Sequence, residues 1–214
     1  MLNLPIVVVS IWLNGVSYFI QYATQWASLI TIIYFCLVFV SARKDRALES
    51  SGNAPEKYIV QRMTASEKDA YKWRVAACLT ETITIGWQFS VVFVFWAVVA
   101  EIFLPVAPSW IWQFGLIEAH TFPFLQVLFE FFMCDSRLRL RDFWYSCALA
   151  VVYCMINYEF TEELPQPVYP FLLWEKFYAN VAACALCIAI GTGGLFLSGY
   201  IQERLMGRRF RDSW

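Results

Sequence analysis

The sequence predicts an all-α integral membrane protein, a polytopic bundle of transmembrane helices that forms one domain over residues 1–214. Three observations predict this fold. Hydrophobic residues make up 60% of the chain and charged residues 15%, a balance that the surface of a soluble domain does not tolerate. Five apolar segments are long enough to cross a bilayer, and the basic residues gather in alternate connections between them.

The predicted spans follow from length, because a helix needs about 20 residues to cross a hydrocarbon core of about 30 Å. We expect five spans, at residues 18–42, 75–104, 109–134, 143–158 and 177–201. Residues 1–13 are long enough for about half a span, and the turn dipeptide Asn14–Gly15 follows them. We interpret this half-span as a short, tilted or interfacial helix and not as a signal peptide, since it has no basic start.

The basic residues predict the orientation in the membrane. Of the 16 Lys and Arg residues, eight lie in 43–74, three in 137–141 and four in 204–211. Because these segments follow alternate helices, all three fall on one face, which the positive-inside rule makes the cytoplasmic or matrix face. We therefore place the polar loop 43–74 and the C-terminal tail 202–214 there, and Lys176 with the acidic connection on the opposite face.

Two connections have distinctive compositions. Residues 41–72 are polar, and we expect a loop that carries one short surface helix at 66–73. The connection 159–170 contains Pro165, Pro167 and Pro170, which exclude a helix and favour a rigid, extended turn.

Polar and small residues recur at helical spacing within the spans. In hydrocarbon such side chains face other helices, so each stripe predicts a face that points to the centre of the bundle. The first span has Gln21, Thr24, Ser28 and Thr31, the second has Glu81, Thr84 and Gln88, and the last has Cys184, Cys187, Gly191, Gly194 and Ser198. Small residues at this period let two helix backbones approach closely, and we interpret Cys184 and Cys187 in the same way.

The one histidine, His120, is expected near mid-membrane, and Pro123 should kink its helix and free the carbonyl of Ala119 beside the imidazole. Thr24 enters the membrane from the same acidic side, so the two side chains can meet in the bundle. A threonine hydroxyl needs a neighbouring base to act as a nucleophile, and imidazole has a suitable pKa. Thr24 and His120 are therefore the candidate catalytic residues.

A structural interpretation competes with catalysis at this pair. A buried imidazole needs a hydrogen-bonding partner, and a threonine on a neighbouring helix is an ordinary one. No carboxylate is placed to orient the imidazole, since Glu118 points to another side of the helix and Glu130 lies nearly three turns away. A lone histidine also excludes bis-histidine haem, and no metal site is expected.

Several short motifs resemble the androgen-induced, rolling-stone-like integral membrane proteins. They are residues 22–26 (YATQW), 33–35 (IYF), 94–96 (VFW), His120 with Pro123 and Glu130, and 168–172 (VYPFL). The best-known members of that family hydrolyse fatty acid esters of hydroxy fatty acids. The resemblance implies that Thr24 and His120 are the catalytic pair, although the first helix and loop of the family are shortened here to the segment before Asn14.

Two functions follow as hypotheses. We favour a helical subunit with a structural role in a large membrane complex, such as a mitochondrial respiratory or ATP synthase assembly. The alternative is an intramembrane threonine hydrolase of fatty-acid esters that uses Thr24 and His120. The expected partners are other membrane subunits and membrane lipids, with no cofactor beyond structural lipids; a net charge of −1 gives no reason to expect nucleic acid. The mitochondrial inner membrane is the preferred location and the endoplasmic reticulum the alternative.

Overall fold

The computed structural model describes residues 22–50, 64–133, 138, 140–162, 169 and 176–204, and this part of the chain is a helical bundle without strands. The predicted all-α fold is thus confirmed. The predicted half-span 1–13 and the tail beyond residue 204 lie outside the described residues. The elements are α2 (Ala23–Ser50), α3 (Ala65–Val94), the π-helical turn η2 (Phe95–Val99), α4 (Ala100–Phe103), α5 (Trp110–Met133), the 3₁₀ turn η3 (Leu140–Asp142), α6 (Phe143–Glu162) and α7 (Phe177–Arg204).

Four helical stretches of the described chain are long and apolar enough to cross a membrane, which identifies an integral membrane protein. They are Ala23–Ser50, Ala65–Phe103, Trp110–Met133 and Phe177–Arg204. The fifth predicted span, 143–158, is also helical and lies within α6. It does not reach the same hydropathy, because Trp144, Tyr145 and Asn157 interrupt its apolar sequence.

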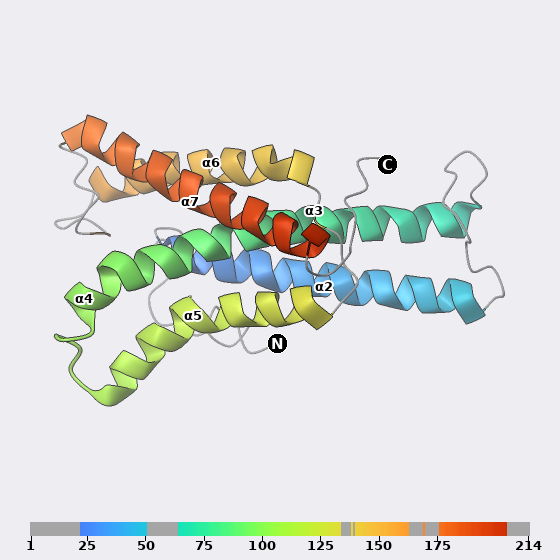
Figure 1. The fold of residues 1–214 in the computed structure, drawn as a ribbon, viewed down its shortest axis with the longest axis horizontal. Coiled ribbons are helices and arrows are strands. Elements are labelled where there is room, and N and C mark those ends of the chain that lie inside the picture. The colour runs from blue at the N-terminus through green and yellow to red at the C-terminus, as the bar shows by residue number, and fades with distance from the viewer. Residues whose placement is uncertain are drawn as a thin grey trace.

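Helix α3 occupies the centre of the bundle. It packs along α2 and also contacts α5, α6 and α7 (Figure 1). The polar stripe of α3 points inward as predicted, since Glu81, Thr84 and Gln88 are each about 1% exposed. Gln88 donates a hydrogen bond from Nε2 to Thr31 Oγ1 over 2.8 Å, which joins the stripe of α3 to that of α2.

The stripe of α2 also points inward. Thr24, Ser28 and Thr31 are all buried, whereas Gln21 lies outside the described residues. Tyr34, one turn further along α2, donates a hydrogen bond to the Glu130 carboxylate on α5. The two helices are therefore held together by a polar contact inside the bundle.

The small residues of α7 allow a close helix crossing, as predicted. A Cβ atom on Gly191 would lie 2.5 Å from the carbonyl oxygen of Gly86 and 2.5 Å from Ser90 Oγ. Backbone therefore touches backbone where α7 crosses α3, and Ser90 Oγ donates a hydrogen bond to the carbonyl of Cys187 over 2.7 Å. Among membrane helices this is the packing that glycine makes possible.

The expectation of a loop over 41–72 is wrong at both ends of that segment, because residues 41–50 and 65–72 are helical. Helix α2 continues to Ser50 and α3 begins at Ala65, so only part of the segment lies between helices, and the expected short helix 66–73 is the first two turns of α3. Helix α2 has 28 residues, and 28 residues rise about 42 Å, which exceeds a hydrocarbon core of about 30 Å. Figure 1 shows the two helices running on together beyond the ends of α5, α6 and α7.

We call this projecting pair, residues 41–50 and 65–74, the α2–α3 arm. Two ion pairs join its helices: Lys44 Nζ lies 2.8 Å from Asp69, and Arg74 lies 2.8 Å from Asp45. A capping box starts α3, in which the Thr64 hydroxyl accepts from the Glu67 amide and the Glu67 carboxylate accepts from the Thr64 amide. These polar contacts explain why a charged sequence continues as helix outside hydrocarbon.

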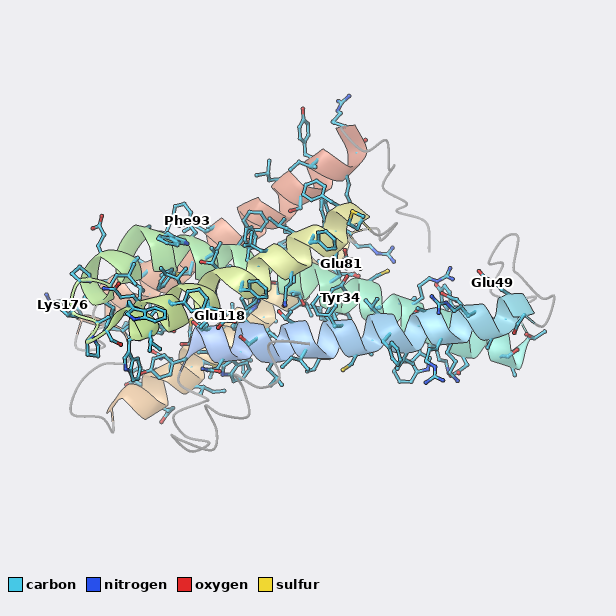
Figure 2. The ribbon with its side chains drawn as sticks, turned by 90° about the horizontal axis from the view of Figure 1, so that it is seen from below. Tyr34, Glu49, Glu81, Phe93, Glu118 and Lys176 are labelled. Atoms are coloured by element: carbon cyan, nitrogen blue, oxygen red, sulfur yellow. The ribbon has the colours of Figure 1, made fainter. Side chains whose placement is uncertain are left out.

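The described basic residues of all three segments gather at one end of the bundle. Turn η3, with Arg141, contacts α3 and α7, and the Leu138 amide donates to Gln202 near the end of α7 over 3.1 Å. The α2–α3 arm extends from this same end (Figure 1). Figure 2 shows Lys176 at the opposite end from Glu49.

The outer surface of the bundle is apolar. Phe129, Trp112 and Leu186 are each more than 60% exposed, and many other large hydrophobic side chains accompany them on α5, α6 and α7 (Figure 2). Such a continuous apolar surface is unstable in water and suits contact with lipid.

Candidate functional site

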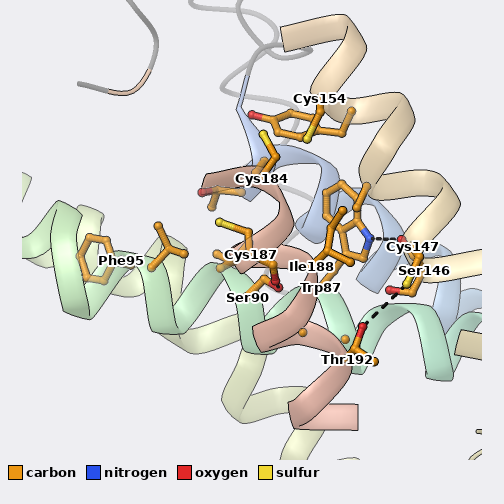
Figure 3. A pocket seen from close by; sticks show the side chains of 18 of the residues that line it. Trp87, Ser90, Phe95, Ser146, Cys147, Cys154, Cys184, Cys187, Ile188 and Thr192 are labelled. Carbon is orange, nitrogen blue, oxygen red and sulfur yellow. Dashed lines mark hydrogen bonds between the residues drawn. The ribbon is translucent and has the colours of Figure 1, made fainter. Parts of the chain in front are cut away.

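A cavity of about 110 Å³ lies inside the bundle, and residues from α2, α3, η2, α5, α6 and α7 line it. Figure 3 shows the close packing of α3, α6 and α7 around it. Its walls are mostly apolar, with Trp87, Val91 and Ile188 among them. A cavity of this composition suits an apolar ligand with a few polar groups placed to act on it.

The structure brings the two predicted catalytic residues to this one cavity. Thr24, near the start of α2, and His120, in the middle of α5, both line it. Thr24 is 8% exposed, so its hydroxyl is shielded from the surroundings of the bundle. Two residues that are 96 positions apart in the sequence therefore border the same cavity.

Two contacts fix the imidazole of His120. Its Nδ1 lies 2.7 Å from the carbonyl oxygen of Leu116, one turn earlier in α5. Its ring stacks on Phe95, with 4.1 Å between centroids and 13° between planes. Because a carbonyl can only accept, Nδ1 carries the hydrogen and Nε2 is the nitrogen left to accept a proton.

The bond to Leu116 differs from the expectation that Pro123 would supply the imidazole with the carbonyl of Ala119. Pro123 does lie inside α5 and is buried. The imidazole instead bonds to the carbonyl four residues before it in the same helix. The orienting role that a carboxylate often plays thus falls to the backbone of α5.

The π-helical turn η2 lies directly at the site and was not predicted. It spans Phe95–Val99, and both of its end residues line the cavity. A π-turn inserts an extra residue into a helix and rotates the side chains that follow, which is why such turns are frequent at functional sites. The apolar sequence FWAVV carries no signal of it, since every residue fits an ordinary transmembrane helix.

Two tyrosines near Thr24 were also not singled out as site residues. Tyr169, from the connection between α6 and α7, accepts a hydrogen bond from the Ala23 amide over 3.0 Å. Its hydroxyl also makes side-chain hydrogen bonds with Thr24 and with Tyr153 of α6. The nucleophile candidate is therefore part of a hydroxyl cluster built from three segments of the chain.

Three thiols line the cavity near these tyrosines: Cys154 of α6 and Cys184 and Cys187 of α7 (Figure 3). All three are free cysteines, and Cys154 and Cys184 are in side-chain contact. Within the described residues, no group of three or more His, Cys, Asp and Glu side chains is arranged to hold a metal ion.

The acidic residues of α5, Glu118 and Glu130, make no contact with the imidazole that the structure shows. Glu130 accepts the hydroxyl of Tyr34, and Glu118 is only partly buried. Figure 2 shows Glu118 and the Tyr34 position at different levels along the bundle. Glu130 therefore serves the packing of α5 against α2 in the half of the bundle near the arm.

The comparisons with known proteins find no relative. No family model, no curated protein and no solved structure matches the chain. The resemblance to the rolling-stone-like family therefore stays a prediction, and function is argued from the cavity and its side chains.

Proposed function

We propose that the protein is an intramembrane hydrolase of lipid esters, with Thr24 as the nucleophile and His120 as the general base. The observation that carries this proposal is that both side chains line one apolar cavity in the bundle, with His120 bonded through Nδ1 so that Nε2 is free to accept. In this proposal α6 completes the bundle as a fifth span.

The chemistry uses groups of this chain and water alone. His120 Nε2 takes the hydroxyl proton of Thr24 as Oγ1 attacks the ester carbonyl, and the imidazolium returns the proton to the departing alcohol oxygen. Water then attacks the threonine ester, His120 again accepts and returns the proton, and the fatty acid leaves. The apolar walls accommodate the acyl chain and keep other water away from the intermediate.

The test is turnover of lipid esters by the purified protein, together with labelling by a fluorophosphonate probe. Thr24→Ala should abolish both, and His120→Asn should lower kcat by about 10²–10⁴-fold, the usual contribution of a general base. Thr80→Ala is the matched control, because the Thr80 hydroxyl is bonded to the Ala76 carbonyl and does not line the cavity.

Unchanged labelling of Thr24→Ala would contradict the proposal. The subunit hypothesis predicts a different result, comigration with a large complex on native gels of the solubilised source membrane. A monomer there that turns over lipid esters favours the hydrolase.

A further inference from the structure

Four of the chain's seven cysteines line the cavity: Cys147, Cys154, Cys184 and Cys187. All four are free and partly buried. Close helix packing explains Gly191 and Gly194, because a Cβ on either would meet α3, but it does not explain thiols that border an open space. Alanine would pack as closely at these positions and has no reactive group.

Cys154 of α6 and Cys184 of α7 are in contact where the two helices meet. Figure 3 shows their sulfur atoms turned toward one another, with Cys187 further along α7. Cys154 donates its S–H hydrogen to the sulfur of Cys184. A sulfur that accepts a hydrogen bond is more easily deprotonated, and the thiolate is the form of cysteine that attacks. Cys184 is therefore the attacking thiol of the pair.

Cys184 and Cys187 are not an equivalent pair, although they are closer in the sequence. They lie three positions apart on one helix, where Cβ atoms are separated by about 5–6 Å. A disulfide needs Cβ atoms about 3.5–4.5 Å apart. A bond between these two thiols would distort α7, whereas Cys154 and Cys184 lie on different helices whose side chains already meet.

The walls of the cavity decide which oxidant suits these thiols. Trp87, Val91 and Ile188 make them largely apolar, and the outer surface of the bundle suits lipid. Hydrogen peroxide is strongly hydrated, so its transfer into such a space is costly. A lipid hydroperoxide carries its O–O group on an apolar chain, whose transfer into the cavity is favourable.

We propose that Cys184 and Cys154 form a thiol site that reduces lipid hydroperoxides and becomes a disulfide between α7 and α6. Cys184 Sγ attacks the terminal oxygen of the hydroperoxide, the O–O bond breaks, and the thiol hydrogen passes to the departing oxygen to give an alcohol. Cys154 Sγ then attacks the sulfenic sulfur of Cys184, the S–O bond breaks, and the hydroxyl group leaves as water with the hydrogen of Cys154. The two thiols supply the two electrons that the peroxide accepts. This reaction uses neither Thr24 nor His120, so it is independent of the proposed hydrolysis.

The experiment treats the purified, fully reduced protein in phosphatidylcholine liposomes with linoleic acid hydroperoxide. Trypsin cleaves after Arg141, Lys176 and Arg204, so mass spectrometry detects the disulfide as a link between fragments 142–176 and 177–204. We expect one hydroxy fatty acid for each link that forms. Hydrogen peroxide at the same concentration should form the link more slowly.

Three substitutions assign the roles of the thiols. Cys154→Ser should lose the link and leave Cys184 as a sulfenic acid, which dimedone traps on fragment 177–204. Cys184→Ser should lose both the link and this dimedone adduct. Cys36→Ser is the control, because Cys36 is exposed on α2 and does not line the cavity, and it should form the link at an unaltered rate.

The unaltered protein is sufficient to overturn the proposal, so the test does not depend on the folding of any variant. Absence of the link, or alcohol produced without it, would contradict the reaction. A link that persists in Cys154→Ser would show that another thiol is the partner and overturn the assigned pair. Equal rates with the two peroxides would overturn the assignment of a lipid oxidant.

Discussion

The polar side chains inside the bundle bond either to the backbone of their own helix or to a group on another helix. Thr31 has both, because it donates to Ala27 and accepts from Gln88. Tyr34 has the second kind, since it is fully buried and donates to Glu130 across α2 and α5. In hydrocarbon a side chain that loses such a partner cannot turn to water, so each cross-helix bond specifies one packing.

Tyr34→Phe tests how much the hydrogen bond between Tyr34 and Glu130 stabilises the bundle. The variant keeps the buried ring but leaves the Glu130 carboxylate without this donor, so the free energy of unfolding should fall by about 1–3 kcal/mol. Unfolding in mixed micelles measures the change. Tyr200→Phe, an exposed position, is the control and should be close to neutral; an equal loss in both variants would contradict the role of the bond.

Single residues also show where sequence reasoning succeeds and where it stops. Helical periodicity predicted the inward direction of Thr24, Glu81 and Gln88, because spacing alone determines which side chains share a face. It could not predict that Tyr169 reaches Thr24, since a residue between two helices has no periodic face. The partner of His120 was also missed, because a carbonyl offers no signal in the sequence.

Among the elements, α3 determines how the bundle packs, and its crossing with α7 depends on Gly191. The small residues in the middle of α7 made a close approach of two backbones predictable, but not that α3 is the partner. The α2–α3 arm was not predicted, because its charges were taken as the end of each helix. Outside the membrane, Ala, Arg, Lys and Glu are good helix formers, and residues 41–50 consist largely of such types.

Two glycines two positions apart provide a matched test of the crossing. A Cβ on Gly191 would meet the Gly86 carbonyl and Ser90 at 2.5 Å, whereas a Cβ on Gly193 would meet nothing within 4 Å. Gly191→Ala should therefore lower the free energy of unfolding by about 1–3 kcal/mol through overpacking. Gly193→Ala should be neutral or raise it by up to about 1 kcal/mol, since alanine favours helix.

The measurement is again unfolding in mixed micelles. A loss of stability in Gly193→Ala as large as in Gly191→Ala would show that α7 does not cross α3 at Gly191. The crossing would then have to be placed elsewhere along α7.

The whole molecule has two chemically different ends. The α2–α3 arm and the described basic residues other than Lys176 lie at one end, and Lys176 lies at the other (Figure 2). The hydrophobic content predicted a membrane protein, and the positions of the basic residues along the chain predicted two different ends. Both predictions rest on many residues at once, so no single residue decides them. The number of spans is harder to predict, since α6 is helical but has aromatic and polar residues that lower its hydropathy.

Cysteine labelling in sealed vesicles tests the arrangement of the two ends. Glu49→Cys and Arg204→Cys should react with a membrane-impermeant maleimide from the same side, and Lys176→Cys only from the other. The chain without an added cysteine measures the background from its own thiols. Labelling of Glu49→Cys and Lys176→Cys from one side would contradict the transmembrane orientation.

The backbones of Gly86 and Gly191, which meet where α7 crosses α3, also border the cavity and form a rigid part of its wall. A wall of side chains can change rotamers to admit a longer guest, but main chain held in two helices has no such freedom. A ligand in the cavity would therefore meet main chain of fixed shape on this side and side chains that can adjust elsewhere.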